Sequence, residues 1–224
     1  MISLVNVIPK LNLPLAEVIK INCTYNSYSD ISLFWVQDTE KAVISMMDGN
    51  MVIYNAHANI EELREFISVI SPVSVFSDAN TLTQLFGQSY HKVCVVKSDN
   101  SFKSDIASDV LNSESIYKLL SVEGLELPQY DYFAVDFCHR LNHGGLKYFA
   151  IKDSCVAIGI CDGQAVLVNG IASHKKGMGS VALKGLLSQY SATAVAVCEK
   201  TIMPFYLKNN FNYSYDAGYW RKNA

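Results

Sequence analysis

The first hundred residues carry short blocks of apolar positions whose spacing changes from strand-like to helical. The block 41–55 is apolar on both sides of Asp48-Gly49, a dipeptide that predicts a tight hairpin. Behind Asn59, a favourable N-cap, apolar residues recur at helical spacing until Pro72 forbids continuation. In chain order the expected elements are a polar, turn-rich stretch at 21–30, a strand at 31–37, a hairpin within 41–55, a helix at 60–70, a strand at 73–76, a short helix at 79–87 and a strand at 92–96.

The second half begins with a polar stretch that is rich in serine and aspartate, 98–114, and this stretch is the best candidate for a linker. Two helices are expected after it, and the second is expected to end at Gly144-Gly145. Three strands with turns between them follow, and a short basic turn then leads into an apolar-periodic helix. The expected elements are helices at 115–123 and 131–143, strands at 146–153, 154–163 and 165–173, and a helix at 181–187.

The basic turn between the last of these strands and the helix has the chemistry of an anion-binding site. Gly177 and Gly179 have no Cβ and allow a bound group to approach the backbone closely. The N-terminus of a helix presents unpaired N–H groups and a partial positive charge, so phosphate is a natural occupant. His174, Lys175 and Lys176 add side-chain charge. The turn is therefore predicted to hold a diphosphate, although the same pattern by itself is equally typical of a solvated loop with a tight bend.

Two familiar nucleotide-binding motifs do not fit this turn. The P-loop pattern needs an earlier glycine and a Lys-Ser or Lys-Thr pair after the second glycine, and the sequence has neither. The dinucleotide-binding pattern needs a third glycine where Ala182 stands, and an acidic residue at the end of a strand about 20 residues later. The predicted diphosphate therefore belongs to another kind of ligand.

The turn and a second block resemble two motifs of the GNAT N-acetyltransferases. Residues 174–179 are similar to the family's acyl-CoA pyrophosphate loop, Arg/Gln-x-x-Gly-x-Gly/Ala, with His174 in the first position. Residues 194–197 resemble the next strand, and 204–211 resemble the family's helix that carries a Phe-Tyr pair and ends before a Gly-Phe pair. Asn210 stands where that glycine is usual, and asparagine also tolerates the left-handed conformation.

The resemblance implies an α/β (α+β) fold, a GNAT-like mixed central sheet flanked by helices. It also implies acetyl-CoA as the acyl donor and no metal. In the family, the strand before the loop separates from its neighbour and leaves N–H groups free for the cofactor, so the N–H of Ile171 is expected to polarise the acyl carbonyl. The cofactor-binding residues implied by the match are Ile171, Ala172, His174, Lys175, Lys176, Gly177, Met178, Gly179 and Ser180.

Two side chains are candidates for the chemistry. Tyr206 matches the tyrosine of the family's second block, and a phenol can donate a proton to a departing thiolate of comparable basicity. Glu199, at the end of the strand before that helix, is the candidate general base, although many members have an Asn there that contacts the cofactor. Weaker candidates are Asp136 and the pair His139 and His143. The two histidines are four apart, on one face of a helix, and without a carboxylate or cysteine beside them they are more typical of exposed side chains than of ligands or bases.

The chain is long enough for two small domains, and the linker divides it into 1–110 and 111–224. The order of elements in the first part is that of a GNAT half without its glycine turn. Two interpretations follow: a degenerate GNAT-like domain in tandem with a working one, or an unrelated α/β domain.

The composition limits the kinds of partner that the protein is expected to bind. Half of the residues are hydrophobic, 17% are charged, and the net charge is −3, so a substantial core is expected and no general affinity for nucleic acid or membrane. The beginning is not a secretory signal, and no apolar run is long enough to span a membrane. The six cysteines are scattered without a C-x-x-C pair, which favours reduced thiols in a cytoplasmic protein and makes zinc improbable.

The leading hypothesis is an acyl-CoA-dependent N-acyltransferase that transfers an acetyl group directly to the amine of a small molecule or peptide. The competing hypotheses are a non-catalytic CoA-binding or regulatory module, and a structural domain that retains only the fold. Fold-level analogy supplies neither the acceptor nor the oligomeric state, for which a homodimer is one option.

Overall fold

The structure is a computed structural model that describes residues 1–6, 8, 14–29, 31–38, 41–55, 57–122 and 124–222. The chain forms two compact units. Unit 1 comprises Met1–Val96, Val197–Leu207 and Asn212–Ala224. Unit 2 comprises Lys97–Ala196 and Lys208–Phe211. The division predicted at 110 and 111 stays a prediction.

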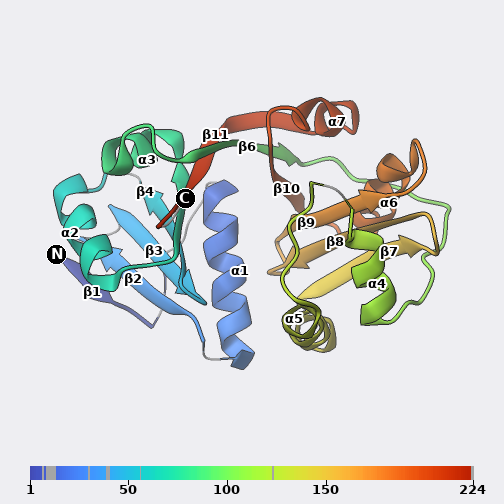
Figure 1. Ribbon diagram of the computed structural model, residues 1–224, viewed down its shortest axis with the longest axis horizontal. Coiled ribbons are helices and arrows are strands. Elements are labelled where there is room, and N and C mark those ends of the chain that lie inside the picture. The colour runs from blue at the N-terminus through green and yellow to red at the C-terminus, as the bar shows by residue number, and fades with distance from the viewer. Residues whose placement is uncertain are drawn as a thin grey trace. The chain divides into compact units, whose positions relative to one another are not determined.

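The strands of unit 1 form a mixed sheet in the order β1-β2-β3-β4-β5-β11-β6 (Figure 1). Strands β1 to β4 pair antiparallel, β4 and β5 pair in parallel, and β11 pairs antiparallel with β5 through Ala217↔Asp78 to Arg221↔Ser74. The bounds are β1 Ile2–Leu4, β2 Leu33–Gln37, β3 Ala42–Met47, β4 Asn50–Asn55, β5 Ser74–Asp78, β6 His91–Ser98 and β11 Asn212–Arg221.

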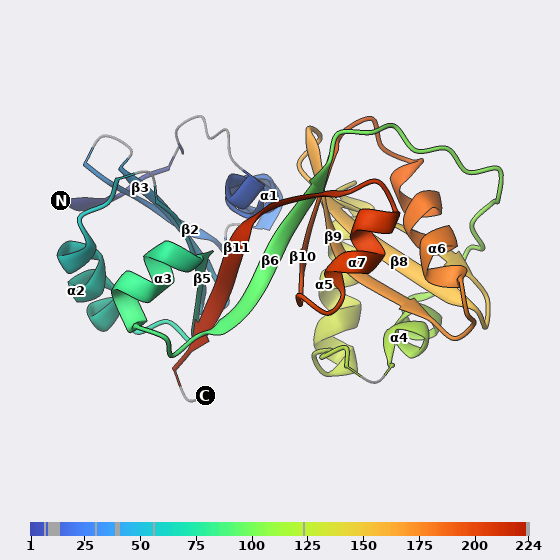
Figure 2. The same ribbon diagram turned by 90° about the horizontal axis from the view of Figure 1, so that it is seen from above.

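Helices cover both faces of this sheet (Figure 2). On one face, α2 (Ile60–Ile70) and α3 (Ala79–Phe86) bury Leu63 and Leu82 against Trp35 and Ile44. On the other face, α1 (Pro14–Ser29) buries Ile19 against Phe34, Val43 and Val52. The alternation of neighbours such as Phe34 and Trp35 between the two cores is the two-residue period of a strand whose faces are both buried.

Most elements expected for the first hundred residues are confirmed. Met47 pairs with Asn50 across a hairpin whose turn residues Asp48 and Gly49 have positive φ angles of 51° and 75°. Helix α2 begins after Asn59, whose side chain accepts a hydrogen bond from the N–H of Glu62.

The reading of 21–30 as a turn-rich stretch is wrong, because α1 continues to Ser29. Its polar residues have partners that a sequence pattern does not reveal. The buried Asn22 donates from Nδ2 to Ser45 Oγ over 3.2 Å, and Asn26 Oδ1 accepts from the N–H of Ser32 at 2.8 Å. These polar contacts add to the burial of Ile19 in stabilising the helix.

Unit 2 contains the strand order β10-β9-β8-β7, in which β7, β8 and β9 are antiparallel and β9 and β10 are parallel. Helices α4 and α5 lie against one face of the sheet, and α6 lies against the other (Figure 2). The bounds are α4 Ser113–Leu120, α5 Tyr130–Asn142, β7 Leu146–Ile151, β8 Cys155–Cys161, β9 Ala165–Ser173, α6 Met178–Leu187, β10 Thr193–Cys198 and α7 Met203–Lys208, the last of which contributes Lys208 to unit 2.

Helix α6 packs unusually close to the sheet because it carries Gly185. A Cβ on this residue would lie 2.3 Å from the ring of Phe149, so a side chain there would displace the helix. Ala182 and Leu186 complete the contact with Ala157 and Cys155. The close packing fixes the helix whose N-terminus carries the basic turn.

The polar segment after β6 contains no helix or strand up to Asn112, as expected of a linker. It is nevertheless held along β7. The N–H of Asp109 donates to the carbonyl of Ala150 at 2.8 Å, and the N–H of Ala150 donates to Ser108 Oγ at 3.0 Å. The edge of β7 is therefore covered by this segment.

The two halves of the sequence repeat one order of elements: helix, three-stranded meander, helix, strand, helix, strand. In the first half this order is α1, β2 to β4, α2, β5, α3 and β6, and in the second it is α4 with α5, β7 to β9, α6, β10, α7 and β11. The predicted order around the basic turn and the predicted mixed sheet flanked by helices are confirmed. No helix within the described ranges has the length and apolarity to cross a membrane.

Candidate functional site

The basic turn connects β9 to α6, and Gly177 is the N-cap of that helix. Its φ angle is +85°, and no heavy atom lies within 4 Å of the position where a Cβ would be. No side chain caps α6, and its first turn has no acidic residue. Lys175 and Lys176 are exposed beside it. The turn therefore combines left-handed backbone, open space and positive charge at one helix terminus.

Backbone donors at this terminus are available to a ligand. The N–H of Met178 donates to the carbonyl of Lys175 at 3.2 Å, which closes the turn. Within the described part of the chain, the N–H groups of Gly179 and Ser180 have no backbone or side-chain acceptor. Unpaired donors of this kind are what an anion at a helix N-terminus binds.

Helix α2, at the matching place in the first half, has its N-terminus closed by its own neighbours. Asn59 caps it, and the Gln37 side chain accepts from the N–H of Asn59 at 2.7 Å and donates to its carbonyl at 3.0 Å. Glu61 and Glu62 place negative charge in the first turn. An anion is therefore excluded from α2, as the missing glycine turn predicts.

Strand β9 leaves β10 shortly before the turn. Their parallel pairing runs from Ala165↔Thr193 to Val168↔Ala196 and then stops, although β9 continues to Ser173. On its other side, the pairing with β8 shifts at this place, so that Asn169 is an extra residue between two pairs. A bulge of this kind bends a strand away from a partner and frees backbone groups. Ile171 and Ala172 lie on the stretch that has separated from β10.

The corresponding strands of the first half are bridged at the place where their pairing stops. Pairing between β4 and β5 stops at Val52↔Phe76. Beyond it, the Ser77 hydroxyl donates to the carbonyl of Ile53 at 2.7 Å, and the Asn55 amide donates to Thr81 Oγ1 at 2.9 Å. Side chains of the unit therefore bridge the two strands beyond the end of their backbone pairing.

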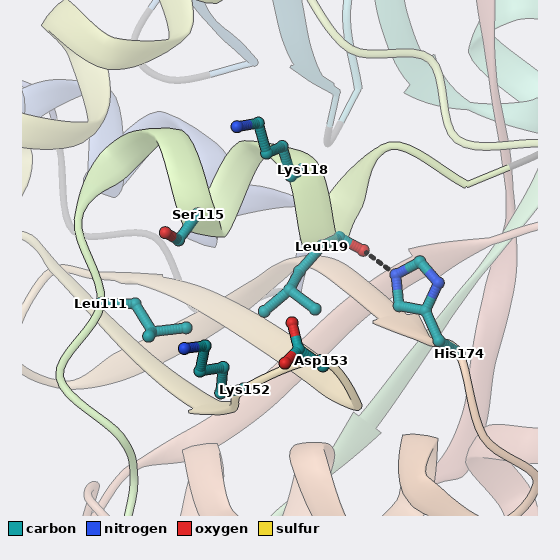
Figure 3. A pocket seen from close by; sticks show the side chains of 7 residues that line it. All are labelled: Leu111, Ser115, Lys118, Leu119, Lys152, Asp153 and His174. Carbon is teal, nitrogen blue, oxygen red and sulfur yellow. Dashed lines mark hydrogen bonds between the residues drawn. The ribbon is translucent and has the colours of Figure 1, made fainter.

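His174 has partners on both its backbone and its ring. Its N–H donates to the carbonyl of Ser154 at 2.8 Å, and Nε2 lies 3.1 Å from the carbonyl of Leu119 at the end of α4. The ring lies at a cavity of about 380 Å³ that also contains Lys118 and Lys152 (Figure 3). His174 thus anchors the turn to α4, with its ring pointing toward that helix.

Ser180 in the first turn of α6 is held by Asn209, a buried residue of the second motif block. The Asn209 amide donates to Ser180 Oγ at 3.0 Å. Asn210 beside it has φ +65°, which is the left-handed conformation expected of this position. Its carbonyl accepts from Ser98 Oγ at 2.8 Å. The two sequence blocks that carry the resemblance thus meet in unit 2.

Tyr206 lies in α7 and is buried in unit 1. Burial, with a smaller contribution from the nearby Cys198, raises the pKa of its phenol well above the usual range. Tyr206 therefore stays protonated at any physiological pH, and its phenol is a weaker acid than that of an exposed tyrosine. Cys198 contacts Cys94, with the two sulfur atoms 3.6 Å apart, and burial raises the pKa of Cys198 to about 12.

Glu199 directly follows β10 and belongs to unit 1. Its carboxylate contacts Nε2 of His91, and both side chains are about half exposed. The Glu199 carbonyl accepts from the N–H groups of Ile202 and Met203, which starts α7. The sequence did not indicate His91 as the partner of Glu199, because 108 residues separate them.

The weaker candidates lie on α5. The rings of His139 and His143 are 4.6 Å apart, as their spacing predicts. Asp136 accepts from Nε–H of the buried Arg140 at 2.9 and 3.0 Å and lines a second cavity of about 230 Å³, which sequence reasoning did not foresee. Asn169 and Gly170, at the bulge of β9, line the same cavity.

Metal ligands do not gather anywhere in the described residues, since no three His, Cys, Asp or Glu side chains form a group there. Five cysteines are free thiols, and the Cys23 side chain lies outside the described ones. The free thiols are Cys94, Cys138, Cys155, Cys161 and Cys198.

Comparison by sequence finds no matching family model and no matching curated protein. Comparison by structure finds GNAT proteins. A protein from Novosphingobium aromaticivorans assigned to the GNAT family of acetyltransferases matches with a TM-score of 0.53 at 8% identity, over 95% of this chain and 100% of its own.

A tandem GNAT protein from the clavulanic acid biosynthesis pathway matches with a TM-score of 0.52 at 9% identity, over 90% of this chain and 86% of its own. A protein from Pyrococcus horikoshii assigned as an acetyltransferase matches with a TM-score of 0.51 at 6% identity, over 97% of this chain and 88% of its own. The chain has the fold of GNAT proteins. At these identities the likeness concerns the fold alone.

Proposed function

We propose that the protein is an acyl-CoA-dependent N-acyltransferase, with acetyl-CoA as the donor and a primary amine as the acceptor. The observation that carries this proposal is a pair of features in unit 2. Strand β9 separates from β10 after Val168, and the uncapped N-terminus of α6 follows the end of β9 after a basic turn. The free edge of β9 fits the amide-containing arm of CoA, and the helix terminus fits its diphosphate.

The predicted residues divide into roles. The N–H groups of Gly179 and Ser180 would bind phosphate oxygens, with Lys175 and Lys176 adding charge, and Gly177 would leave room for the diphosphate. His174 would hold the turn in place through its two hydrogen bonds. The N–H of Ile171 or Ala172 would polarise the thioester carbonyl.

The chemical step would be a direct transfer. The neutral amine attacks the thioester carbon, the C–N bond forms, and the C–S bond breaks. The amine proton passes to a base, for which Glu199 with its partner His91 is the candidate, and Tyr206 donates its phenolic proton to the thiolate. The first half of the chain would be a degenerate GNAT-like repeat, as its closed α2 terminus supports.

A non-catalytic CoA-binding module is the second candidate. Glu199 favours it, because its carboxylate is already paired with His91 and it replaces the asparagine of many relatives. The two candidates share the diphosphate site and differ in turnover.

Isothermal titration with acetyl-CoA and CoA is the first test, with wild type beside Gly177→Trp. We expect micromolar binding that the variant loses while its circular dichroism stays that of wild type. Release of free CoA thiol on addition of amines then separates the enzyme from the binding module. Equal affinity of the two proteins for CoA would refute the assignment of the site.

A further inference from the structure

The second cavity of unit 2 is lined by none of the residues proposed to bind CoA, yet it reaches the place where β9 separates from β10. It lies between α5, the segment between α4 and α5, and the sheet, and Asn169 and Gly170 of the β9 bulge form part of its wall. Ile171, which is proposed to hold the acyl carbonyl, is the next residue of the strand. A molecule in this cavity would lie beside the start of the free edge of β9.

The wall of the cavity is mostly apolar and aromatic. Tyr132, Phe133 and Phe137 of α5 line it, and the rings of Phe133 and Phe137 are stacked with their centroids 5.4 Å apart. Leucines and a proline of the segment between α4 and α5 close the other side. Such a wall favours an apolar body and can also attract a cation to the faces of its rings.

Among the residues that the structure describes, two carboxylates line this wall, those of Glu126 and Asp136. Asp136 is half exposed, and a single N–H, that of Arg140 Nε, lies within 3.0 Å of both of its oxygen atoms. Each carboxylate oxygen can accept more than one hydrogen bond, so Asp136 keeps capacity for an ammonium group. Because the guanidinium of Arg140 is buried next to it, the local charge is suited to one positive charge rather than to several.

The volume of the cavity limits the size of the molecule that it can hold. The cavity encloses about 230 Å³. Pockets for drug-sized ligands enclose about 300–1,000 Å³, so this cavity holds a smaller molecule. An aminoglycoside or a folded polypeptide surface does not fit this volume.

We infer that this cavity is the acceptor site, and that the acceptor is a small primary monoamine with an apolar or aromatic body. The inference rests on the proposed function, because it takes the amine to be the nucleophile of that reaction. Asp136 would bind and orient the ammonium group, and the rings of Phe133 and Phe137 would contact the body. After the ammonium group has released one proton to solvent, the neutral amine would attack the acyl carbon held at the free edge of β9, and its second proton would pass to the base of the proposed step.

The test is an amine panel with acetyl-CoA, followed by release of free CoA thiol. 2-Phenylethylamine and n-butylamine represent the inferred class, and spermidine and the unblocked peptide Ala-Ala-Ala represent the excluded classes. We expect kcat/KM for 2-phenylethylamine to exceed that for spermidine and the peptide by about ten-fold or more, since an unpaired second charge or amide in this wall is unfavourable.

Three variants test which residues of α5 bind the amine. Asp136→Asn should raise the KM for 2-phenylethylamine about ten-fold, because a hydrogen bond to a charged group is lost. Phe133→Leu keeps an apolar wall and should raise it about two- to five-fold through the loss of a ring face. Asp131→Asn is the matched control, since Asp131 is an exposed carboxylate of α5 that does not line the cavity, and it should behave as wild type.

The outcomes separate this inference from the proposed function. Equal rates with spermidine or the peptide, or equal KM values for Asp136→Asn and Asp131→Asn, would overturn the inference while acetyl-CoA binding still stands. If acetyl-CoA does not bind, the proposed function fails. Titration of the protein with 2-phenylethylamine alone then tests whether the cavity binds an amine. Binding that Asp136→Asn weakens supports the amine site, and no binding overturns it.

Discussion

Gly177 and Asn59 take the same place in the two halves of the chain, since each is the N-cap of the helix that follows a three-stranded meander. Asn59 satisfies the terminus of α2 with its own side chain, whereas Gly177 leaves the terminus of α6 without a side-chain cap. One residue type thus closes a helix end, and the other keeps it available to a ligand.

Gly177→Ala should weaken both folding and CoA binding. A non-glycine residue with φ near +85° costs about 1–2 kcal/mol of unfolding free energy, and the new Cβ would enter the space proposed for the diphosphate, with roughly ten-fold weaker CoA binding. Gly163→Ala is the matched control, because Gly163 has φ +91° and equally open surroundings. Urea unfolding should show similar losses for both variants, and titration should show weaker CoA binding for Gly177→Ala alone. Equal CoA affinities would remove Gly177 from the site.

Asn59→Ala should destabilise the protein by about 1 kcal/mol, because the first turn of α2 loses its cap. Its affinity for CoA should stay that of wild type. Asn112→Ala removes the cap of α4, which accepts from the N–H of Ser115 at 2.9 Å, and should cost a similar amount. Chemical denaturation measures both losses. A fall in CoA affinity on the Asn59 substitution would show that the first half of the chain takes part in binding.

Tyr206→Phe should lower kcat by roughly 10²-fold at unchanged CoA affinity, because the leaving thiolate loses its proton donor. Burial raises the pKa of Tyr206, so the wild-type kcat should show no decline near pH 10, where an ordinary phenol would ionise. Steady-state kinetics from pH 7 to pH 10.5 gives both results. A wild-type rate in the variant would leave Tyr206 with a packing role only.

In Tyr190→Phe, the unfolding free energy should fall less steeply with rising pH above pH 10 than it does in wild type. Burial raises the pKa of Tyr190, whose hydroxyl donates to the carbonyl of Gly159 at 3.1 Å, and it raises that of Tyr206 as well. Above pH 10 the unfolded chain releases these two protons while the folded chain keeps them, so stability is fully present below pH 10 and is lost as pH rises.

The slope of this fall is a loss of about 1.4 kcal/mol per pH unit for each tyrosine. Thermal or urea unfolding between pH 9 and pH 11 should show a shallower slope in Tyr190→Phe than in wild type, by up to about 1.4 kcal/mol per pH unit. The variant should also lose about 1 kcal/mol at neutral pH with its hydrogen bond. An unchanged slope would mean that Tyr190 ionises in the folded protein.

The sequence indicated those features of the fold that depend on local pattern. The hairpin at Asp48-Gly49, the cap at Asn59 and the left-handed Asn210 follow from the conformational preferences of single residues. Features that depend on distant partners were missed. In helix α1 the polar Asn22 is buried and donates to Ser45, and the sequence pattern does not reveal this contact.

The same division holds for the candidate site. The glycine turn was visible because it occupies consecutive residues, from His174 to Ser180. The bulge at Asn169 could not be seen in the sequence, because a residue is extra only in relation to the pairing of β9 with β8. Asp136 was a weak candidate in the sequence, and only the tertiary fold shows that it pairs with Arg140 and lines a cavity beside that bulge.

Strand β11 lies beside β5 in unit 1, although its residues, 212–221, are the last to be synthesised of those paired there. During translation, the helices and strands of the first hundred residues emerge while β5 still lacks this neighbour, and all of Lys97–Ala196 must leave the ribosome before it arrives. The nascent chain therefore carries an open strand edge at β5 until β11 emerges. Completion of the first unit is tied to synthesis of the second, so a chain that stops before β11 leaves this edge unpaired.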